Sequence, residues 1–224
     1  MELSILHISD THNKHRIIPK DWLVPADVIV HSGDISGRGY FTEIEDFLNW
    51  YSNLTQYTYK ILIAGNHDFG FQDNPNKVRE LLEKFPNIIY LQDSGVEILG
   101  VNFWGSPWQP TFFNWAFNLD RGLPLKEKWD LIPSNTDVLI THGSAKGYGD
   151  KVINRYSPSG GENVGCEDLL KAILEIKPKL HLSGHIHCDR GVFYNEHTCF
   201  SNAAILNDDY IVAYKPNLFK IPCP

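Results

Sequence analysis

Short apolar runs alternate with longer amphipathic stretches along this chain. The runs are rich in isoleucine, valine and leucine and cover residues 3–8, 28–30, 61–64, 138–140 and 180–182. Apolar runs of this length, bounded by turn residues, are typical of strands in a sheet that is covered on both faces. The amphipathic stretches 42–54, 77–85 and 166–176 predict helices, and Pro178 stops the last of them. This alternation predicts an α/β fold.

Later segments follow a different pattern. Residues 95–104 resemble a hairpin with Gly100 in its turn, and residues 192–194, 198–202 and 210–214 resemble a closing meander. Antiparallel strands should therefore join the parallel ones. We expect two mixed sheets flanked by helices in a single domain that spans residues 1–224, because no linker, repeat or low-complexity segment divides the chain.

Composition and charge narrow the classes of function. The chain has 224 residues and a formal net charge of -7, so no overall basic field attracts nucleic acid or an anionic membrane. We expect no membrane association and no high-affinity nucleic-acid binding. Met1 leads directly into the first apolar run, no run is long enough to span a bilayer, and the four cysteines are scattered. These features favour a cytoplasmic protein with free thiols, and they leave an oligomer open.

A polar cluster directly follows each of the five apolar runs. In open α/β sheets, ligands bind at the carboxyl ends of the strands, so five such strands in one sheet would deliver these clusters to one edge. The clusters contain seven candidate metal ligands, which are Asp10, His12, Asp34, Asn66, His142, His185 and His187.

The residue types suit transition metals. Imidazole and carboxylate ligands favour Mn, Fe, Zn or Ni over Mg or Ca. Seven side chains exceed the need of one ion that keeps a position open for chemistry, and they suit two divalent ions that share a bridging carboxylate. Gly33, Gly65 and Gly184 precede three of the candidates and fit tight turns close to the ions. Because histidine ligands must be neutral, metal affinity should fall as the pH drops toward about 6.5.

The ordered motifs D-x-H, G-D, G-N-H-D, T-H-G and G-H-x-H resemble those of the calcineurin-like metallophosphoesterases, and the likeness covers residues 5–205. The resemblance implies a four-layer α-β-β-α sandwich. It also implies a phosphoesterase in which a water that bridges two metal ions attacks phosphorus in line.

The resemblance assigns a role to each motif residue. It implies a first ion bound by Asp10, His12 and His187, a second ion bound by Asn66, His142 and His185, and Asp34 as the bridge between them. His67 would act as the catalytic acid or hydrogen-bond donor at the scissile phosphate. One departure is Gly37, which stands where the family usually has an acid or amide in G-D-x-x-D/N. This weakens any supporting side-chain role at that position but not the bridging role of Asp34.

Several segments resemble the MPPED-type (239-type) subgroup of this family. They include Y-L-Q-D-S at 90–94, G-S-P-W at 105–108, W-A-F-N at 115–118 and K-W-D-L-I-P at 128–133. The subgroup implies Mn-favouring phosphodiesterases that act on 2′,3′- or 3′,5′-cyclic nucleotides. Some members replace one histidine of G-H-x-H with glycine, whereas this chain keeps both His185 and His187.

An aromatic stretch begins at the end of the predicted hairpin. Its members are Trp104, Trp108, Phe112, Phe113, Trp115 and Phe117. Aromatic rings stack on nucleobases, but they also fill cores and interfaces. Trp108 is the candidate for substrate binding by stacking.

Other functions remain open at this point. A phosphomonoesterase, including a protein phosphatase, would use the same two ions, although few basic residues follow the motifs and this favours a diester. A non-catalytic interaction module on the same scaffold is the alternative of another class. A nuclease is disfavoured by the acidic charge balance.

Overall fold

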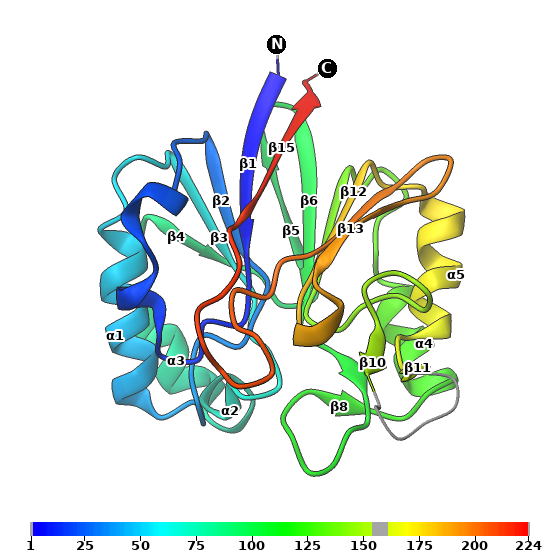
Figure 1. Cartoon of the computed structure of the whole chain (residues 1–224), viewed down its shortest axis with the longest axis horizontal. Coiled ribbons are helices and arrows are strands. Elements are labelled where there is room, and N and C mark those ends of the chain that lie inside the picture. The colour runs from blue at the N-terminus through cyan, green and yellow to red at the C-terminus, as the bar shows by residue number, and fades with distance from the viewer. Residues whose placement is uncertain (1, 154–160, 224) are drawn as a thin grey trace.

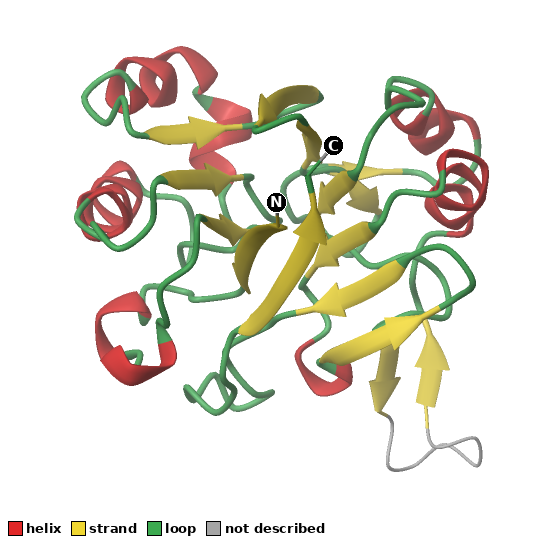
Figure 2. Cartoon of the chain, turned by 90° about the horizontal axis from the view of Figure 1, so that it is seen from above, coloured by secondary structure: helices red, strands yellow, loops and turns green. Residues whose placement is uncertain are grey.

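Two β-sheets form the centre of the structure (Figure 1, Figure 2). The computed structural model describes residues 2–153 and 161–223. The first sheet has five strands in the order β15 (Asn217–Pro222), β1 (Glu2–Ile8), β2 (Val28–His31), β3 (Tyr59–Leu62) and β4 (Ile88–Tyr90). β15 runs antiparallel to β1, and the other pairs are parallel.

The second sheet has six strands and is also mixed. Their order is β13 (Gly191–Tyr194), β14 (Cys199–Asn202), β12 (Leu180–Ser183), β9 (Val138–Thr141), β6 (Val101–Ser106) and β5 (Ser94–Ile98). The two outermost pairs are antiparallel and the three inner pairs are parallel. Two short ribbons pair β7 (Gln109–Pro110) with β8 (Asn118–Leu119) and β10 (Lys151–Ile153) with β11 (Gly161–Asn163).

Helices cover the outer face of each sheet, as Figure 1 shows. The helices beside the first sheet are α1 (Phe41–Ser52), α2 (Phe69–Asp73) and α3 (Pro75–Leu82), and those beside the second are α4 (Leu123–Trp129) and α5 (Glu167–Ile176). Three 3-10 turns are η1 (His15–Ile17), η2 (Lys20–Trp22) and η3 (His187–Asp189). The predicted α-β-β-α sandwich is confirmed. Within the described residues, no helix has the length and apolar character needed to cross a membrane.

The continuous apolar runs are explained by burial on both faces of the strands. In β1, Leu3 and Ile5 belong to the core between the sheets, whereas Leu6 and Ile8 belong to the core under the helices of the first sheet. Successive side chains of a strand point to opposite faces, so a run of apolar residues serves both layers. A third core lies between the second sheet and its helices and includes Leu139 of β9.

The closing segment differs from the sequence prediction. Residues 210–214 form no strand, because the side chain of Asn207 accepts hydrogen bonds from the backbone of Asp209 and Ile211 and closes a turn there. Tyr210 has a φ of 57°, which is incompatible with an extended strand. The strand that closes the fold is β15 instead, paired with β1.

The five strands that precede the polar clusters do not share one sheet, which corrects another expectation. β1, β2 and β3 lie in the first sheet, while β9 and β12 lie in the second. Their carboxyl ends still meet, because a parallel bridge between Ser9 and Ala204 joins the end of β1 to the segment after β14. Ser9 donates its N–H to the carbonyl of Ala203 at 3.0 Å. The two sheets therefore converge at the edge that carries the polar clusters.

Candidate metal centre

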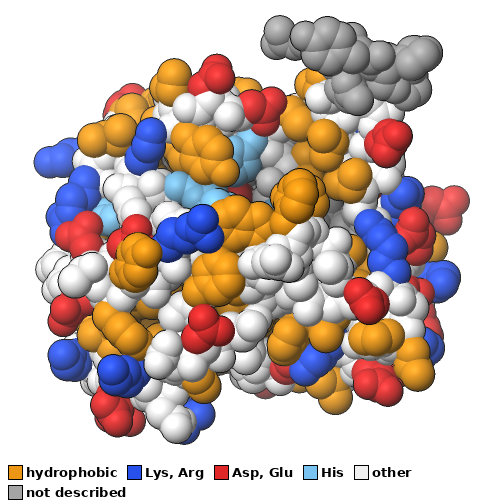
Figure 3. All heavy atoms as spheres, turned by 90° about the horizontal axis from the view of Figure 1, so that it is seen from below, with side chains coloured by type: hydrophobic (Ala, Val, Ile, Leu, Met, Phe, Trp, Pro, Cys, Tyr) orange, Lys and Arg blue, Asp and Glu red, His pale blue; other side chains and the backbone are white. Residues whose placement is uncertain are grey.

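The side chains that follow the five strands gather into three overlapping groups. Within each group, the ligand atoms lie within 4.8 Å of one another; the groups are Asp10, His12 and His187, then His12, Asp34 and His67, and then Asp34, His142 and His185. Histidine side chains are visible on the face seen in Figure 3, which looks at the molecule from below relative to Figure 1. The shared residues His12 and Asp34 join the three groups into one centre.

Asp10 anchors the first group. His187 Nε2 lies 3.4 Å and His12 Nε2 lies 4.0 Å from Asp10 Oδ1. His187 Nδ1 donates to the carbonyl of Asn207 at 3.1 Å, so Nε2 is the nitrogen left for a metal. The backbone N–H of His185 donates to both Asp10 oxygens, at 3.1 and 3.0 Å. Asp10 therefore fixes the loop that carries both histidines of G-H-x-H.

Asp34 lies between the two halves of the centre. Its Oδ2 is 3.5 Å from His12 Nε2 and 3.3 Å from His142 Nε2. His142 Nδ1 donates to the carbonyl of Ser32 at 2.9 Å, while its Nε2 lies 2.8 Å from Asn66 Oδ1. A carboxylate between two groups of nitrogen ligands is the arrangement that a bridged pair of ions requires.

His12 gives an independent test of whether this centre fits metal. The residue is only 7% exposed, yet neither of its ring nitrogens has a hydrogen-bond partner within the described part of the chain. Buried polar atoms are normally paired, so two orphan nitrogens need a missing partner. A cation beside Asp10 and Asp34 would supply one to Nε2. The donor set of imidazoles and carboxylates fits a transition-metal ion.

The backbone at the centre is unusual. Asp10, His12, Asp34 and His185 have φ values of 55°, 37°, 56° and 71°. Residues other than glycine seldom adopt positive φ, and such conformations concentrate at functional sites, where the surrounding structure imposes them. The fold therefore holds four of the seven ligand candidates in backbone conformations that direct their side chains toward the centre. These conformations lower the local stability of the backbone.

The glycines that precede three of the ligand candidates lie against other ligand candidates. A Cβ atom at Gly184 would lie 2.1 Å from Asp10 Oδ2, and one at Gly65 would lie 2.3 Å from Asp34 Oδ1. At Gly33, where φ is 102°, it would lie 2.6 Å from His142 Nδ1. Any larger residue at these positions would displace a ligand side chain, which gives the physical reason for the glycines in these motifs.

Burial and neighbouring charge divide the histidines into two kinds. Burial lowers the pKa of His12 to about 4 and that of His185 to about 3, against the attraction of nearby carboxylates. Burial also opposes protonation of His142 and His187, but Asp34 and Asp10 respectively outweigh it and raise both pKa values to about 9. In the metal-free protein, His142 and His187 therefore carry protons at neutral pH.

Metal binding should therefore release protons well above pH 6.5. A metal bound by His142 and His187 would replace their protons, so we expect affinity for Mn²⁺ to rise up to about pH 9, by up to about tenfold per pH unit for each histidine. Calorimetry in buffers of different ionisation enthalpy would count the released protons. The same protonated pairs stabilise the metal-free fold below pH 6.5, and this contribution is lost as the pH rises through about 9. A metal affinity independent of pH from 6.5 to 9 would contradict this assignment.

His67 lies beside the centre in a fixed orientation. Its Nδ1 donates to the carbonyl of Gly37 at 2.9 Å, and its backbone N–H donates to Asp34 Oδ1 at 2.8 Å. The ring of Trp115 stacks on the imidazole at 4.0 Å between centroids, with an angle of 22° between the planes. Gly37 stands where the family motif usually has an acid or amide side chain. Its backbone carbonyl accepts the hydrogen bond from His67 instead.

Trp115 and Tyr210 are site residues that the sequence analysis did not single out. The guanidinium of Arg38 lies over the Trp115 ring at 4.9 Å. Tyr210 packs its ring 4.9 Å from that of His12 and 5.3 Å from that of His187. Trp115 belongs to the aromatic stretch, but no local signal separates it from the other aromatic residues there.

Trp108, the sequence candidate for substrate stacking, has protein partners on several sides. Its Nε1 donates to Asp93 Oδ2 at 2.8 Å, the Lys128 ammonium lies 4.5 Å from the ring centroid, and Phe117 packs edge-on at 5.5 Å. These contacts indicate that Trp108 packs between two hydrophobic cores. Substrate binding by Trp108 stays a prediction.

Three further histidines are fully buried and pair with hydroxyl groups. His7 lies between Ser201 Oγ at 2.8 Å and Ser32 Oγ at 2.9 Å. His31 and His181 pair in the same way with Thr11 and Thr141, at 3.0 and 2.8 Å. Thr11 and Thr141 each adjoin a ligand candidate, so these buried pairs hold the segments that carry the metal ligands.

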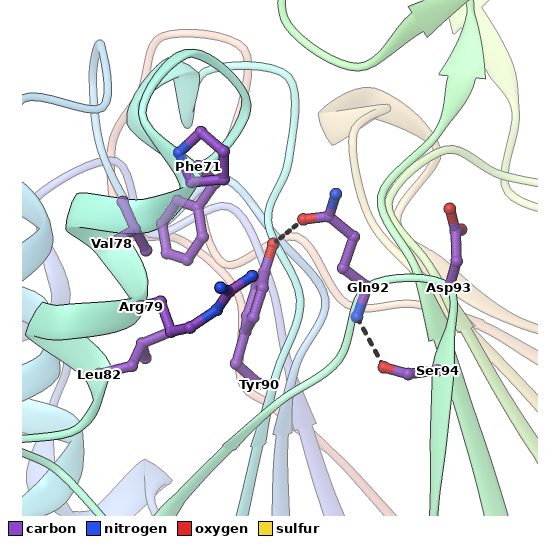
Figure 4. Close-up of a pocket in the computed structure, with 9 residues that line it drawn as sticks. Phe71, Val78, Arg79, Leu82, Tyr90, Gln92, Asp93 and Ser94 are labelled. Carbon is purple, nitrogen blue, oxygen red and sulfur yellow. Dashed lines mark hydrogen bonds between the residues drawn. The ribbon is translucent and has the colours of Figure 1, made fainter.

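Two hollows adjoin His185, and two larger cavities lie elsewhere in the described part of the chain. The hollows have volumes of about 350 and 200 Å³ and share Val152, His185 and Ile186. One of these, of about 440 Å³, contains none of the ligand candidates (Figure 4), and neither does the other, of about 470 Å³, which is lined by residues of α4 and α5. In the cavity that Figure 4 shows, the Tyr90 hydroxyl donates to Gln92 Oε1 at 2.7 Å, and the side chain of Arg79 lies beside the tyrosine ring. Of these four cavities, the hollows beside His185 are the ones that adjoin the metal centre.

Comparison with known proteins agrees with this geometry. A family model described as calcineurin-like phosphoesterase matches residues 3–189. The human Metallophosphoesterase domain-containing protein 1 is 36% identical over 97% of this chain and 70% of its own length. The Caenorhabditis elegans UPF0046 protein C25E10.12 is 37% identical over 97% of this chain and 80% of its own length. The crystal structure of TT1561 from Thermus thermophilus has the same fold, with a TM-score of 0.63 at 12% identity over 90% of this chain and 89% of that one.

The resemblance read from the motifs is thus confirmed over nearly the whole chain. The match to a metallophosphoesterase domain-containing protein also agrees with the subgroup segments at 90–94 and 105–108. Buried histidine and aspartate clusters stand at the ends of the strands where the motifs lie. The chain belongs to the family of calcineurin-like, metal-dependent phosphoesterases.

Proposed function

We propose that this chain hydrolyses phosphodiesters at a centre that holds two divalent transition-metal ions, with Mn favoured. The observation that carries the proposal is the position of Asp34 between two groups of ligand atoms, with the backbone N–H of His67 on its other oxygen. Bound ions would supply Lewis-acid charge and an acidified water for attack on phosphorus. The proposed ligands are Asp10, His12 and His187 on one side, Asn66, His142 and His185 on the other, and Asp34 between them.

His67 is the proposed catalytic acid. The carbonyl oxygen of Gly37 can only accept a hydrogen bond, so Nδ1 of the His67 imidazole carries a proton. A proton that His67 transfers to the leaving group would therefore come from Nε2. One ring nitrogen of His67 lies within 4.8 Å of ligand atoms of His12 and Asp34, close enough to serve a phosphate bound there. Trp115 and Gly37 together restrict rotation of the ring.

The charge in the two hollows beside the centre supports a diester over a monoester. A monoester dianion gains from additional cations at its binding site, whereas a diester carries one negative charge and two ester groups. Among the described residues that line the two hollows, Arg121 is the one arginine or lysine. Its guanidinium is already engaged, since Nη1 donates to the carbonyl of Gly165 at 2.7 Å and to Glu167 Oε2 at 2.6 Å.

Metal reconstitution with parallel substrates tests the proposal. The metal-stripped protein would be loaded with Mn, Fe, Zn, Ni or Mg and assayed on bis(p-nitrophenyl) phosphate, p-nitrophenyl phosphate and 2′,3′- and 3′,5′-cyclic nucleotides. We expect turnover of diesters that requires about two equivalents of Mn²⁺ or a similar ion. The cyclic nucleotides test the substrate class that the subgroup resemblance implies.

Two outcomes would favour the alternatives. Turnover of p-nitrophenyl phosphate alone would assign the chain as a phosphomonoesterase. Binding of two metal ions without turnover of any of these esters would favour a non-catalytic module on this scaffold, because fold alone does not fix function.

A further inference from the structure

The larger hollow beside His185 is lined mainly by apolar side chains. Phe112, Val152, Val164 and Ile186 contribute to its wall, and its volume of about 350 Å³ is in the range of small-molecule sites. The ring of Phe112 lies 6.2 Å from that of His185. A substituent that extends from the metal centre past His185 would therefore contact apolar side chains.

The polar side chains around this hollow have partners elsewhere. Thr111 Oγ1 donates to Asp120 at 2.9 Å, Ser144 Oγ donates to the carbonyl of Gly149 at 2.9 Å, and Arg121 is engaged as described above. Side chains that read the edge of a nucleobase need free donors and acceptors. The hydroxyl hydrogens of Thr111 and Ser144 are thus used within the protein, and Arg121 is held by the protein, so the hollow favours an apolar group over a nucleobase edge.

Exposure of the wall shows that the described residues leave this hollow open. Phe112 is 50% exposed and Val152 is 38% exposed, although both side chains are apolar. Figure 3 shows hydrophobic side chains next to the histidines on this face. Exposed apolar groups that line a concave site next to catalytic groups mark a ligand surface.

We propose that this hollow binds a hydrocarbon ester group, alkyl or aryl, of a phosphoester whose phosphate lies at the metal centre. The inference rests on the proposed function and adds a substrate class to it. The smaller hollow on the other side of His185 includes Asp208 and Tyr210 and suits the second, polar ester group of an asymmetric diester. The shared wall of Val152, His185 and Ile186 places the phosphate where the two hollows meet.

Binding of alkylphosphonates to the Mn-loaded protein tests the hollow without requiring turnover, because the carbon–phosphorus bond is not hydrolysed. Calorimetry would compare methyl-, ethyl-, propyl- and butylphosphonate. Each methylene that enters the hollow should tighten binding about fourfold, so butylphosphonate should bind about 60-fold more tightly than methylphosphonate if all three enter.

A matched pair of valine variants gives the control. Val152 lines the hollow and Val192, on β13, does not, yet the two are 38% and 37% exposed. Val152→Ser should weaken butylphosphonate binding about four- to fifteenfold and leave methylphosphonate binding unchanged, since one or two buried CH₂ equivalents are lost. Val192→Ser should change neither.

The outcomes separate this inference from the proposed function. Equal affinity for all four phosphonates, no binding of butylphosphonate at millimolar concentration, or equal effects of the two valine variants would overturn the hydrocarbon site. Tighter binding of AMP than of butylphosphonate, with loss in Val152→Ser, would overturn it in favour of a nucleobase. A steep dependence on chain length in a protein that hydrolyses no diester would support the hollow and overturn the diesterase proposal.

Discussion

Replacing Asp34 with asparagine should remove most of the bound metal and lower diester turnover by about 10³-fold. The amide keeps an oxygen for the His67 N–H, which lies 2.8 Å from Asp34 Oδ1. It loses the negative charge between His12 and His142. Lewis-acid stabilisation of the transition state is worth several kcal/mol, and about 4 kcal/mol corresponds to the expected rate loss. Elemental analysis of the purified variant would give the metal content, and steady-state assays would give the rate.

Asp150→Asn is the matched control for this change. Asp150 is also fully buried, but its oxygens accept from the side chain of Asn163 and the backbone of Gly165, and it belongs to none of the metal-ligand groups. Its metal content should stay at the wild-type level. Full metal content and full turnover in the Asp34→Asn variant would contradict the bridging role of Asp34.

His67→Ala should lower turnover by about 10²–10⁴-fold while the protein keeps its metal. This range is the usual contribution of a general acid. The loss should be largest with a 3′,5′-cyclic nucleotide, whose leaving group is an alkoxide that needs a proton. It should be smaller with bis(p-nitrophenyl) phosphate, because p-nitrophenolate leaves without protonation. Parallel measurement of metal content and of both rates would check the assignment.

Substitutions of Trp115 provide a second test of proton donation by His67. Its ring lies 4.0 Å from that of His67, so Trp115→Leu should also reduce turnover of the cyclic nucleotide more than that of the p-nitrophenyl diester. Trp115→Phe, which keeps a stacking ring, should restore most of the difference. Equal losses on both substrates in His67→Ala would show that the histidine orients the substrate rather than donating a proton.

The sequence by itself determined the fold class and the candidate ligands. Runs such as residues 3–8 and 138–140 place apolar residues on both faces, and this pattern is typical of strands covered on both sides. The ligands follow these runs within a few residues along the chain, so the position of Asp10 after β1 or His142 after β9 is a local property. Local patterns can be read without knowledge of the rest of the molecule.

The tertiary structure decided everything that depends on residues far apart in the chain. The bridge between Ser9 and Ala204 brings two sheets to one edge, and pairing of β15 with β1 closes the first sheet. No periodicity predicts these contacts, because strands of different sheets share the same two-residue repeat.

The same limit applies to the side chains around the centre. Trp108 and Trp115 lie in one aromatic stretch, yet Trp108 pairs with Asp93 while Trp115 stacks on His67. The carbonyl of Gly37 partners His67 without any side-chain motif. Sequence composition specifies which groups are available for chemistry, whereas packing between distant segments specifies which of them meet.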